Sequence, residues 1–401
     1  MALREHKSLN EILKFVRENE QENPAHLVLR AKQFPDWPIK EIAEQIAARK
    51  KAKDKLPEWY NHPEIIFPPA LSMEQCSSEA TAKFKASLVK GRHFADLSGG
   101  FGIDTYYLSQ QFDNVIYVEQ QTHLCELAAY NFQQLKKNIV IHHQEAAQFL
   151  AETGVHFDWI YVDPARRDQN QKKVSRWQDC SPDLTILLPD ILNKCENLLV
   201  KGAPMLDISQ GVEDLKGYVR NVYVLEWKGE VRELLFHLRK EKTTNPSIKA
   251  VLLSDDGEVK KHFEANRVEE ETSIVHYSMP QKYIFEPSPS LMKSGLFKAL
   301  AKAFAIQKLH PNTQLFTASD TLKDFPGRSF LLHEIIQVNK KALKKILPDM
   351  KVNLSTRNFP MPVADLKKKL GIKDGGEYYI FACTLQDESK RLLLCKKIKN
   401  Q

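Results

Sequence analysis

The sequence predicts a doubly wound α/β fold, in which a mostly parallel sheet of seven strands follows a helical N-terminal region and precedes small α+β C-terminal domains. Three observations support this fold class. Short apolar runs alternate with helical stretches from residue 93 onward, as in successive βαβ units. Two apolar segments near residue 230 are separated only by Lys228-Gly229-Glu230, which favours a hairpin. The first 90 residues show helical spacing interrupted by prolines.

The seven strands of the sheet come from the apolar runs between residues 93 and 240. Because no 3.6-residue period separates the last two runs, we expect them to form an antiparallel hairpin that closes the otherwise parallel sheet. The predicted strands are 94–97, 115–118, 139–142, 159–162, 205–208, 222–226 and 231–238.

Composition shifts along the chain suggest four regions. They are a helical region (1–90) with a capped helix start within residues 72–82, a catalytic domain (91–275), a small α+β, ferredoxin-like linker domain (276–330) and a basic α+β domain (331–401). In the last two we expect helices at 291–309 and 363–370, a turn at Gly375-Gly376, and strands at 378–382 and 392–395.

The overall composition is that of a globular protein, with 42% hydrophobic and 27% charged residues. The six cysteines include no Cys-x-x-Cys pair, so neither a zinc cage nor a disulfide framework is indicated. No apolar run reaches the ~18 residues that a membrane span needs, and no apolar segment follows the charged start of the chain. We therefore expect a cytoplasmic protein without a membrane partner.

The positive charge of the chain is concentrated at its C-terminal end. Residues 331–401 contain 15 Lys and Arg against 7 Asp and Glu, a net charge of +8, whereas the whole chain has +7. A basic domain beside a nearly neutral one suggests a polyanion such as nucleic acid as partner, although a lysine-rich face also serves solubility.

The sharpest motif is Asp96-Leu-Ser-Gly-Gly-Phe-Gly-Ile-Asp-Thr105, placed where the first strand turns into a helix. Glycines there allow a tight bend and the close approach of a ligand to backbone N–H groups. A dinucleotide fingerprint starting at Gly100 would need glycine at Thr105, so NAD binding is disfavoured. The candidate cofactor-binding residues of this loop are Asp96, Ser98, Gly99, Gly100, Gly102 and Asp104.

Two further segments contribute candidates for the same cofactor. Glu119 ends the second strand, where its carboxylate can accept hydrogen bonds from ribose hydroxyls, and Gln120 follows it. Glu145 and Ala146 follow the third strand and can reach an adenine edge, but a glutamate at a helix start is also favoured by the helix dipole alone.

With Asp163-Pro-Ala-Arg-Arg167 after the fourth strand, these motifs resemble the class I S-adenosylmethionine-dependent methyltransferases, in particular predicted bacterial RNA methyltransferases with a C-terminal THUMP-like domain. The resemblance covers nearly the whole chain. Further segments similar to that family are Glu-Gln-Cys-Ser-Ser-Glu (74–79), Tyr-Ile-Phe-Glu-Pro-Ser-Pro-Ser (283–290), Thr-Arg-Asn-Phe-Pro (356–360) and Lys-Asp-Gly-Gly-Glu-Tyr (373–378). It implies a methyltransferase sheet and S-adenosylmethionine as cofactor.

Asp163, Pro164 and Arg166 are the candidate catalytic residues, and Asp163 also borders the cofactor. The methyl donor is already activated, so an Asp carboxylate and a backbone carbonyl that hold the acceptor nitrogen in line suffice. Related amino-methyltransferases carry (Asp/Asn)-Pro-Pro-(Tyr/Phe), whereas Ala165 and Arg166 stand here, which puts base stacking and amine methylation in doubt. We expect at least one of the two arginines to bind substrate; the alternative is that one pairs with Asp168 or Asp179 and only stabilises the loop.

Other side chains near this motif are weaker candidates. Trp177 would offer a stacking surface, but a lone tryptophan is more often part of a core. Cys180 lacks the local signature of a methyltransferase nucleophile. His142 and His143 would point to opposite faces of a strand, so no metal is implied.

The leading hypothesis is an enzyme that methylates a base in structured RNA, either tRNA or rRNA. The motifs leave two alternatives open: a methyltransferase acting on a protein or small molecule, and a non-catalytic RNA-binding factor with a methyltransferase fold.

Overall fold

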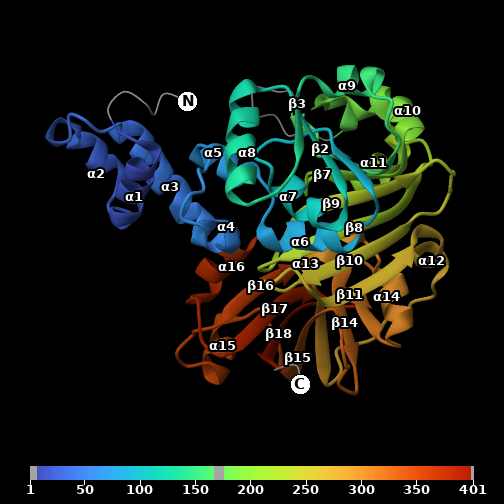
Figure 1. Cartoon of the computed structure of the whole chain (residues 1–401). Helices are drawn as coiled ribbons and strands as arrows, with labels where there is room; N and C mark the ends of the chain where they lie inside the picture. Colours follow the sequence, from blue (N-terminus) through green and yellow to red (C-terminus); the bar gives the residue numbers. More distant parts are fainter. Residues whose placement is uncertain (1–6, 167–175, 399–401) are drawn as a thin grey trace. The chain divides into compact units, whose positions relative to one another are not determined.

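The computed structural model describes residues 7–166 and 176–398, which belong to two compact units (Figure 1). The first unit comprises Met1–Arg220, Arg232–Thr244 and Leu253–Val259. The second comprises Asn221–Val231, Asn245–Leu252 and Lys260–Gln401.

The N-terminal region is helical, as the proline-interrupted periodicity predicts. Its α-helices are α1 (Leu9–Glu18), α2 (Pro24–Leu29), α3 (Ile39–Lys55), α4 (Pro57–Asn61), α5 (Ala70–Gln75) and α6 (Glu79–Ser87). The capped helix start predicted within residues 72–82 is confirmed at α6, although Ser72 itself lies inside α5, which begins after Pro69. The capping serine is Ser78, whose Oγ accepts the Thr81 N–H at the start of α6.

The first unit is built on strands in the order β9-β7-β4-β1-β2-β3. Their bounds are β1 (His93–Asp96), β2 (Asn114–Glu119), β3 (Val140–His143), β4 (Phe157–Val162), β7 (Cys195–Gly202) and β9 (Glu230–Arg239). All neighbours in this order are parallel except β7 and β9, which are antiparallel. The main helices between them are α7 (Ile103–Leu108), α8 (Thr122–Gln134), α9 (Ala146–Glu152), α10 (Leu184–Lys194) and α11 (Ile208–Asp214). The doubly wound α/β class is confirmed.

One predicted strand, 205–208, is wrong. The fifth parallel strand is β7, which begins at Cys195, directly at the end of α10. Residues 205–208 instead lead into α11, because Asp207 caps this helix by accepting the Gln210 N–H. Leu206 is buried for a different reason, since it packs in the turn that precedes the helix.

The predicted hairpin is confirmed as β8 (Val219–Trp227) and β9, but it does not close the sheet, because β8 pairs with a further strand on its other side. The turn between them, Lys228-Gly229, has φ values of 53° and 78°, the left-handed pair that a two-residue hairpin requires. In the second unit β8 pairs in parallel with β10 (Ser247–Leu253), which is followed by β11 (Val259–Asn266) and α12 (Arg267–Thr272).

The second unit also contains a seven-stranded sheet in the order β13-β14-β12-β15-β18-β17-β16. Its elements are β12 (Tyr283–Pro287), α13 (Pro289–Ser294), α14 (Phe297–Ala303), β13 (Gln307–His310), β14 (Thr313–Ala318), β15 (Gly327–Gln337), α15 (Lys340–Ile346), β16 (Asn353–Arg357), α16 (Val363–Leu370), β17 (Tyr378–Thr384) and β18 (Lys390–Lys397). The helix at 363–370 and the last two strands are confirmed. The single helix predicted at 291–309 is wrong: left-handed Gly295 ends α13, and the segment finishes as strand β13.

Among residues 7–166 and 176–398, no helix has both the length and the apolar character needed to cross a membrane.

Candidate cofactor and reaction site

The glycine loop joins β1 to α7 through tight backbone hydrogen bonds. The Gly99 N–H donates to the Val118 carbonyl over 3.0 Å, and the Gly102 N–H donates to the Gly99 carbonyl over 2.9 Å. Gly100 and Gly102 have φ values of 55° and 85°, a region that disfavours side chains. The loop therefore has the bent backbone that the sequence predicts.

Glycine is needed at the three positions of the loop for different physical reasons. A Cβ atom at Gly99 would lie 2.2 Å from the buried Tyr117 ring, and one at Gly102 would lie 2.7 Å from the Phe132 ring. At Gly100 the nearest atom would be the Ser98 carbonyl oxygen, 3.6 Å away. Packing beneath the loop thus accounts for Gly99 and Gly102, whereas Gly100 leaves an open side that a ligand can approach.

The Asp96 carboxylate stabilises this loop through hydrogen bonds. Its Oδ1 accepts the Ser98 N–H (2.9 Å), and its Oδ2 accepts the Thr105 hydroxyl (2.6 Å). The side chain is buried, and burial raises the pKa of the carboxyl to about 7, against the opposing effect of these hydrogen bonds. We propose that Asp96 positions the loop without touching the cofactor.

The raised pKa of Asp96 predicts an unusual pH dependence of stability. Between about pH 4 and pH 7 the folded state holds this proton more tightly than the unfolded state, so each unit of rising pH lowers the free energy of unfolding by about 1.4 kcal/mol. Asp96→Asn keeps the hydrogen bonds, since its amide can donate to Thr105, and removes the titration. In urea denaturation, the stability of the wild type should fall relative to the variant across this window and level off above it. A difference independent of pH would contradict the raised pKa.

Glu119 lies beside the glycine loop at the end of β2. Its Oε2 accepts the Gly100 N–H and its Oε1 the Gln121 N–H, both over 2.9 Å. Each carboxylate oxygen can accept a second hydrogen bond, so these contacts fix the side chain and leave acceptor capacity for a ribose. The arrangement fits the nucleoside part of S-adenosylmethionine.

The remaining cofactor candidates are gathered beside Glu119. The Gln144 N–H donates to the Glu119 carbonyl over 3.1 Å, which brings the segment before Glu145 next to β2. Exposed Glu145 is the residue before α9, and Ala146 is its half-buried first residue. The Gln120 side chain is exposed, and its carbonyl contacts His143 Nε2 at 3.0 Å.

The cofactor loop and the reaction loop are tied together. The Asp163 N–H donates to Ser98 Oγ over 2.6 Å, and the Leu97 N–H donates to the Tyr161 carbonyl over 3.0 Å. Ser98 Oγ in turn donates to Asp96 Oδ1 over 3.1 Å. The two motifs, 65 residues apart, therefore form one continuous site.

Asp163 forms an ion pair that was not predicted from the sequence. Lys201 at the end of β7 donates to Asp163 Oδ2 over 2.5 Å. Burial lowers the pKa of Lys201, but Asp163, Asp104 and Glu233 outweigh it, so the net pKa is raised and the lysine stays charged. Oδ1 of Asp163 has no hydrogen-bond partner among the described residues, and the side chain remains 36% exposed. One oxygen is thus held while the other is available, and Pro164 is buried next to it.

Asp104 does not face the glycine loop but belongs to a buried ionic cluster. Lys85 lies 2.9 Å from Asp104 Oδ1 and 2.8 Å from Glu233 Oε1, and its side chain is fully buried. Asp104 Oδ2 also accepts the hydroxyls of Ser77 and Tyr161, each over 2.8 Å. Burial raises the pKa of Asp104, but the charges of Lys85 and Lys201 together have the larger, opposite effect, so the net pKa of this carboxyl is lowered. These contacts account for Asp104 without a cofactor, so we leave it out of the proposed cofactor set.

The arginines of the reaction motif are described only in part. The backbone of Arg166 pairs with Cys180, in the short strands β5 (Ala165–Arg166) and β6 (Cys180–Ser181). Arg167 and Asp168 lie outside the described residues. The role of Arg166 in binding substrate stays a prediction.

The weaker candidates have structural roles. Trp177 is buried, donates from Nε1 to the Gly211 carbonyl over 3.0 Å and packs on Phe236, so it offers no stacking surface. Cys180 is buried as well. His142 packs against Phe149, whereas His143 contacts Thr122. Within residues 7–166 and 176–398, no group of His, Cys, Asp or Glu is arranged to hold a metal ion.

Lys201, Lys85 and Glu233 are the polar residues that sequence reasoning missed. Lys85 follows another lysine, Lys83, by two residues in Ala82-Lys-Phe-Lys-Ala86, and Glu233 follows Arg232 at the start of the run Leu234-Leu-Phe-His, so neither residue is marked as buried by its neighbours. The partners are also 148 residues apart, so the sequence alone cannot match them.

Comparisons with known proteins concern the domains and the family of the chain. Residues 283–326 match a ferredoxin-like domain and residues 327–397 a THUMP domain-like family. No curated protein sequence matches the chain. A solved structure of a candidate methyltransferase from Porphyromonas gingivalis W83 is 30% identical, with 99% of this chain and 100% of that one covered and a TM-score of 0.87.

Weaker similarities to solved structures concern the fold alone. Mycoplasma capricolum TrmK, bound to S-adenosylhomocysteine, is 11% identical over 40% of this chain and 68% of its own, with a TM-score of 0.32. The Thermus thermophilus 16S rRNA N2 G1207 methyltransferase RsmC, bound to S-adenosylmethionine and guanosine, is 15% identical over 43% and 42%, with a TM-score of 0.30. Since the P. gingivalis protein matches over its full length, the chain belongs to the same family, the class I S-adenosylmethionine-dependent methyltransferases with a C-terminal THUMP-like domain.

Proposed function

We propose that this protein transfers the methyl group of S-adenosylmethionine to a base in structured RNA, either tRNA or rRNA. The observation that carries the proposal is the position of Asp163. Its backbone is bonded to Ser98 of the glycine loop, Lys201 holds one carboxylate oxygen, and the other oxygen is available. An RNA enzyme of this kind works where tRNA and rRNA are, so the proposal includes a cytoplasmic location.

In this proposal the glycine loop and Glu119 hold the nucleoside part of the cofactor. Glu119 accepts hydrogen bonds from the ribose hydroxyls, and the open side of Gly100 admits the ligand to the backbone. Glu145, the Ala146 N–H and Gln120 border the adenine. Bound S-adenosylmethionine supplies an already activated methyl group.

In the proposed reaction, Asp163 orients the nitrogen atom that accepts the methyl group. Its Oδ1 accepts an N–H of the substrate, which aims the nitrogen lone pair at the methyl group, and Lys201 prevents the carboxylate from turning away. Two lysines, Lys85 and Lys201, lie among three carboxylates. The carboxylates are those of Asp104, Asp163 and Glu233, so these five side chains together carry a formal net charge of −1. Such a deficit of positive charge favours a cationic cofactor nearby.

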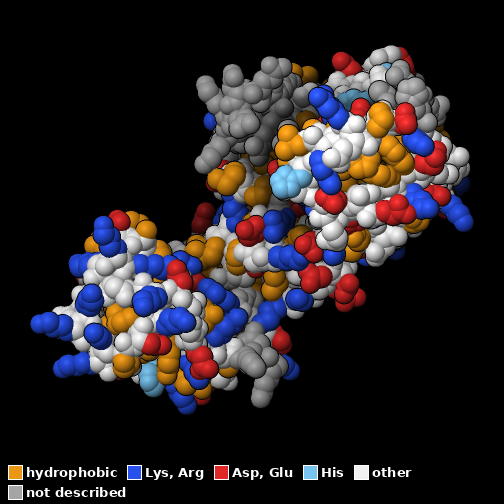
Figure 2. Space-filling view, turned by 90° about the vertical axis from the view of Figure 1, so that its left-hand side faces the viewer, with side chains coloured by type: hydrophobic (Ala, Val, Ile, Leu, Met, Phe, Trp, Pro, Cys, Tyr) orange, Lys and Arg blue, Asp and Glu red, His pale blue; other side chains and the backbone are white. Residues whose placement is uncertain are grey.

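The choice of RNA as substrate is supported by the charge of the second unit. Its helices α15 and α16 carry seven lysines against one acidic residue, Asp365, and six of these lysines are exposed. Figure 2 shows Lys and Arg side chains gathered at the surface in the lower part of that view. Surfaces of this kind bind phosphate backbones in a salt-dependent way. The six are Lys340, Lys341, Lys344, Lys345, Lys368 and Lys369.

The proposal is tested by incubating the purified protein with methyl-tritiated S-adenosylmethionine and total RNA from a host strain that lacks the gene. Label in tRNA or rRNA is expected, and replacing exposed lysines of α15 and α16 by alanine should weaken RNA binding and flatten its salt dependence. Cofactor binding without labelled RNA would contradict RNA as substrate and favour a protein or small-molecule acceptor. Absence of cofactor binding would favour a non-catalytic RNA-binding factor.

A further inference from the structure

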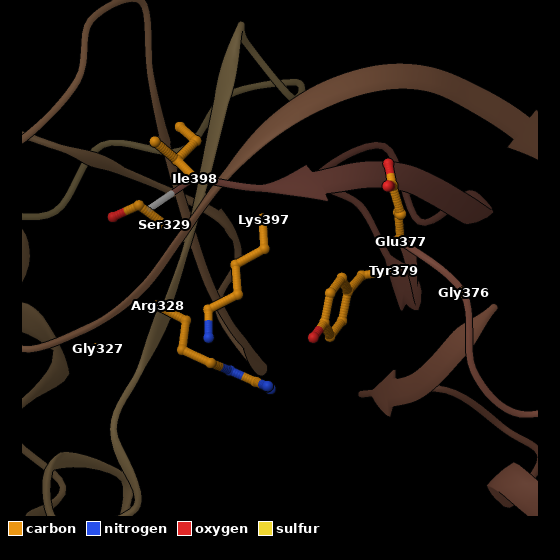
Figure 3. Close-up of a pocket in the computed structure, with 8 residues that line it drawn as sticks. All are labelled: Gly327, Arg328, Ser329, Gly376, Glu377, Tyr379, Lys397 and Ile398. Carbon is orange, nitrogen blue, oxygen red and sulfur yellow. The ribbon is translucent and has the colours of Figure 1, made fainter. Parts of the chain in front are cut away.

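The second unit contains a cationic pocket that the methyl-transfer site does not use. The pocket has a volume of about 480 Å³ and lies where β15, β18 and the start of β17 meet, lined among others by Arg328, Tyr379 and Lys397. Figure 3 shows the tips of these three side chains pointing into the same space. The size suits a nucleotide-sized ligand.

Arg328 is held in place before any ligand arrives. Its Nε donates to Glu286 over 2.6 Å, and its guanidinium lies over the rings of Phe330 and Tyr379 at 5.6 and 5.7 Å. Glu286 is only 3% exposed and also accepts from Arg357 over 2.6 Å. Glu286 contacts Nε and Nη2 of Arg328. The remaining nitrogen, Nη1, has no hydrogen-bond partner among the described residues. A fixed guanidinium with a free N–H is a preorganised anion ligand.

Lys397 and Tyr379 complete the lining. Lys397 is exposed and forms no ion pair with the described residues, unlike its neighbour Lys396, which pairs with Glu377 at 2.9 Å. The Glu377 carboxylate points away from the three tips in Figure 3. The Tyr379 hydroxyl also has no hydrogen-bond partner within the described ranges, while its ring packs edge-on against Phe330. The pocket thus offers donors and one apolar wall.

The charge of the pocket selects among anions. Arg328 and Arg357 share the single carboxylate of Glu286, Lys397 adds a further positive charge, and the pair of Lys396 with Glu377 cancels, which leaves a formal charge of +2 for these residues in and beside the pocket. A phosphate monoester carries a charge of roughly −1.5 to −2 at neutral pH, whereas an internal phosphodiester of RNA carries one negative charge. Complementarity therefore favours the monoester.

We propose that this pocket binds the terminal phosphate monoester of an RNA strand, with Lys397 and Arg328 contacting the phosphate and Tyr379 the attached nucleotide. The identity of the ligand as RNA rests on the proposed function; the affinity for a phosphate monoester does not. The pocket anchors an end of the substrate at a place separate from the methylated base.

The test compares binding of one short single-stranded RNA in three forms, with a 5′-phosphate, with a 3′-phosphate, and with hydroxyls at both ends, by fluorescence anisotropy on the full-length protein. One phosphorylated form should bind about tenfold more tightly than the form without terminal phosphate, the effect of one charge-assisted contact. Uridine monophosphate, but not uridine or inorganic phosphate at equal concentration, should compete.

Lys397→Ala should abolish the preference for the phosphorylated form, and Lys302→Ala, which removes an exposed lysine of α14 outside the pocket and outside α15 and α16, should preserve it. Equal binding of all three RNA forms, or an unchanged preference in Lys397→Ala, would overturn the proposal. Labelling of RNA by the methyltransferase is measured on the same preparations. Methylated RNA without a terminal-phosphate preference would refute the pocket alone, whereas competition by uridine monophosphate without RNA methylation would refute only RNA as the substrate.

Discussion

Asp163→Ala is expected to lower the rate of methyl transfer about a hundredfold to a thousandfold, the usual effect of removing one positioned hydrogen-bonding group from a reaction centre. The substrate nitrogen loses the acceptor that orients it, while the glycine loop and Glu119 still hold the cofactor. The bond from the residue 163 backbone to Ser98 persists, since it does not involve the side chain. Single-turnover rates with labelled cofactor, together with calorimetric cofactor affinity, separate these two effects.

Asp190→Ala provides the matched control, since Asp190 is an exposed residue of α10 with the same change of charge. It should retain the wild-type rate. Asp163→Asn, which keeps the size of the side chain but weakens the pair with Lys201, should fall between wild type and alanine. A rate within a few-fold of wild type in Asp163→Ala would show that the carboxylate is not the acceptor-orienting group.

The second large effect concerns stability. Lys85→Met is expected to lower the free energy of unfolding by about 3–5 kcal/mol, because it leaves the buried carboxylates of Asp104 and Glu233 without their nearest cation. Lys85 is fully buried, so water cannot replace its charge. Urea denaturation of the variant and the wild type measures the difference.

Lys83→Met on the same helix is the control. Lys83 pairs with Glu79 near the surface and is 36% exposed, so its loss should cost about 0–1 kcal/mol. Adding Glu233→Leu to Lys85→Met should restore part of the lost stability, because it removes one of the unpaired charges. Equal destabilisation by the two single lysine variants would contradict the importance of the buried cluster.

The strands of the sheet were predictable where turn residues mark their ends. The hairpin turn at Gly229 and the glycine loop after β1 are such marks, because only particular residues accept their backbone angles. β7 was misplaced because Cys195 both ends α10 and begins the strand, so no loop residues separate the two. The long helix predicted before residue 309 failed because the apolar spacing continues past Gly295, whose left-handed conformation ends α13.

The site was predictable to the extent that it lies at strand ends. Asp96 and Glu119 end β1 and β2, Asp163 follows β4, and parallel strands bring their carboxyl ends to one edge of the sheet. What each residue touches depends on packing that the sequence does not encode locally. Asp104 lies within the motif but faces Lys85, and Gly99 is required by the Tyr117 ring beneath it.

The contacts of the N-terminal helices also define how much of the chain folds together. The Trp59 ring packs against Phe101 of the glycine loop at 5.1 Å, and the Asn131 side chain bonds both backbone groups of Ile66. Residue 90 thus separates two sequence patterns without separating two folding units. A shortened protein that begins at residue 91 would lack both the Trp59 ring that covers its glycine loop and Lys85, one of the two cations of its buried cluster. Helices α4 to α6 and the sheet that carries the glycine loop should therefore unfold in one cooperative transition.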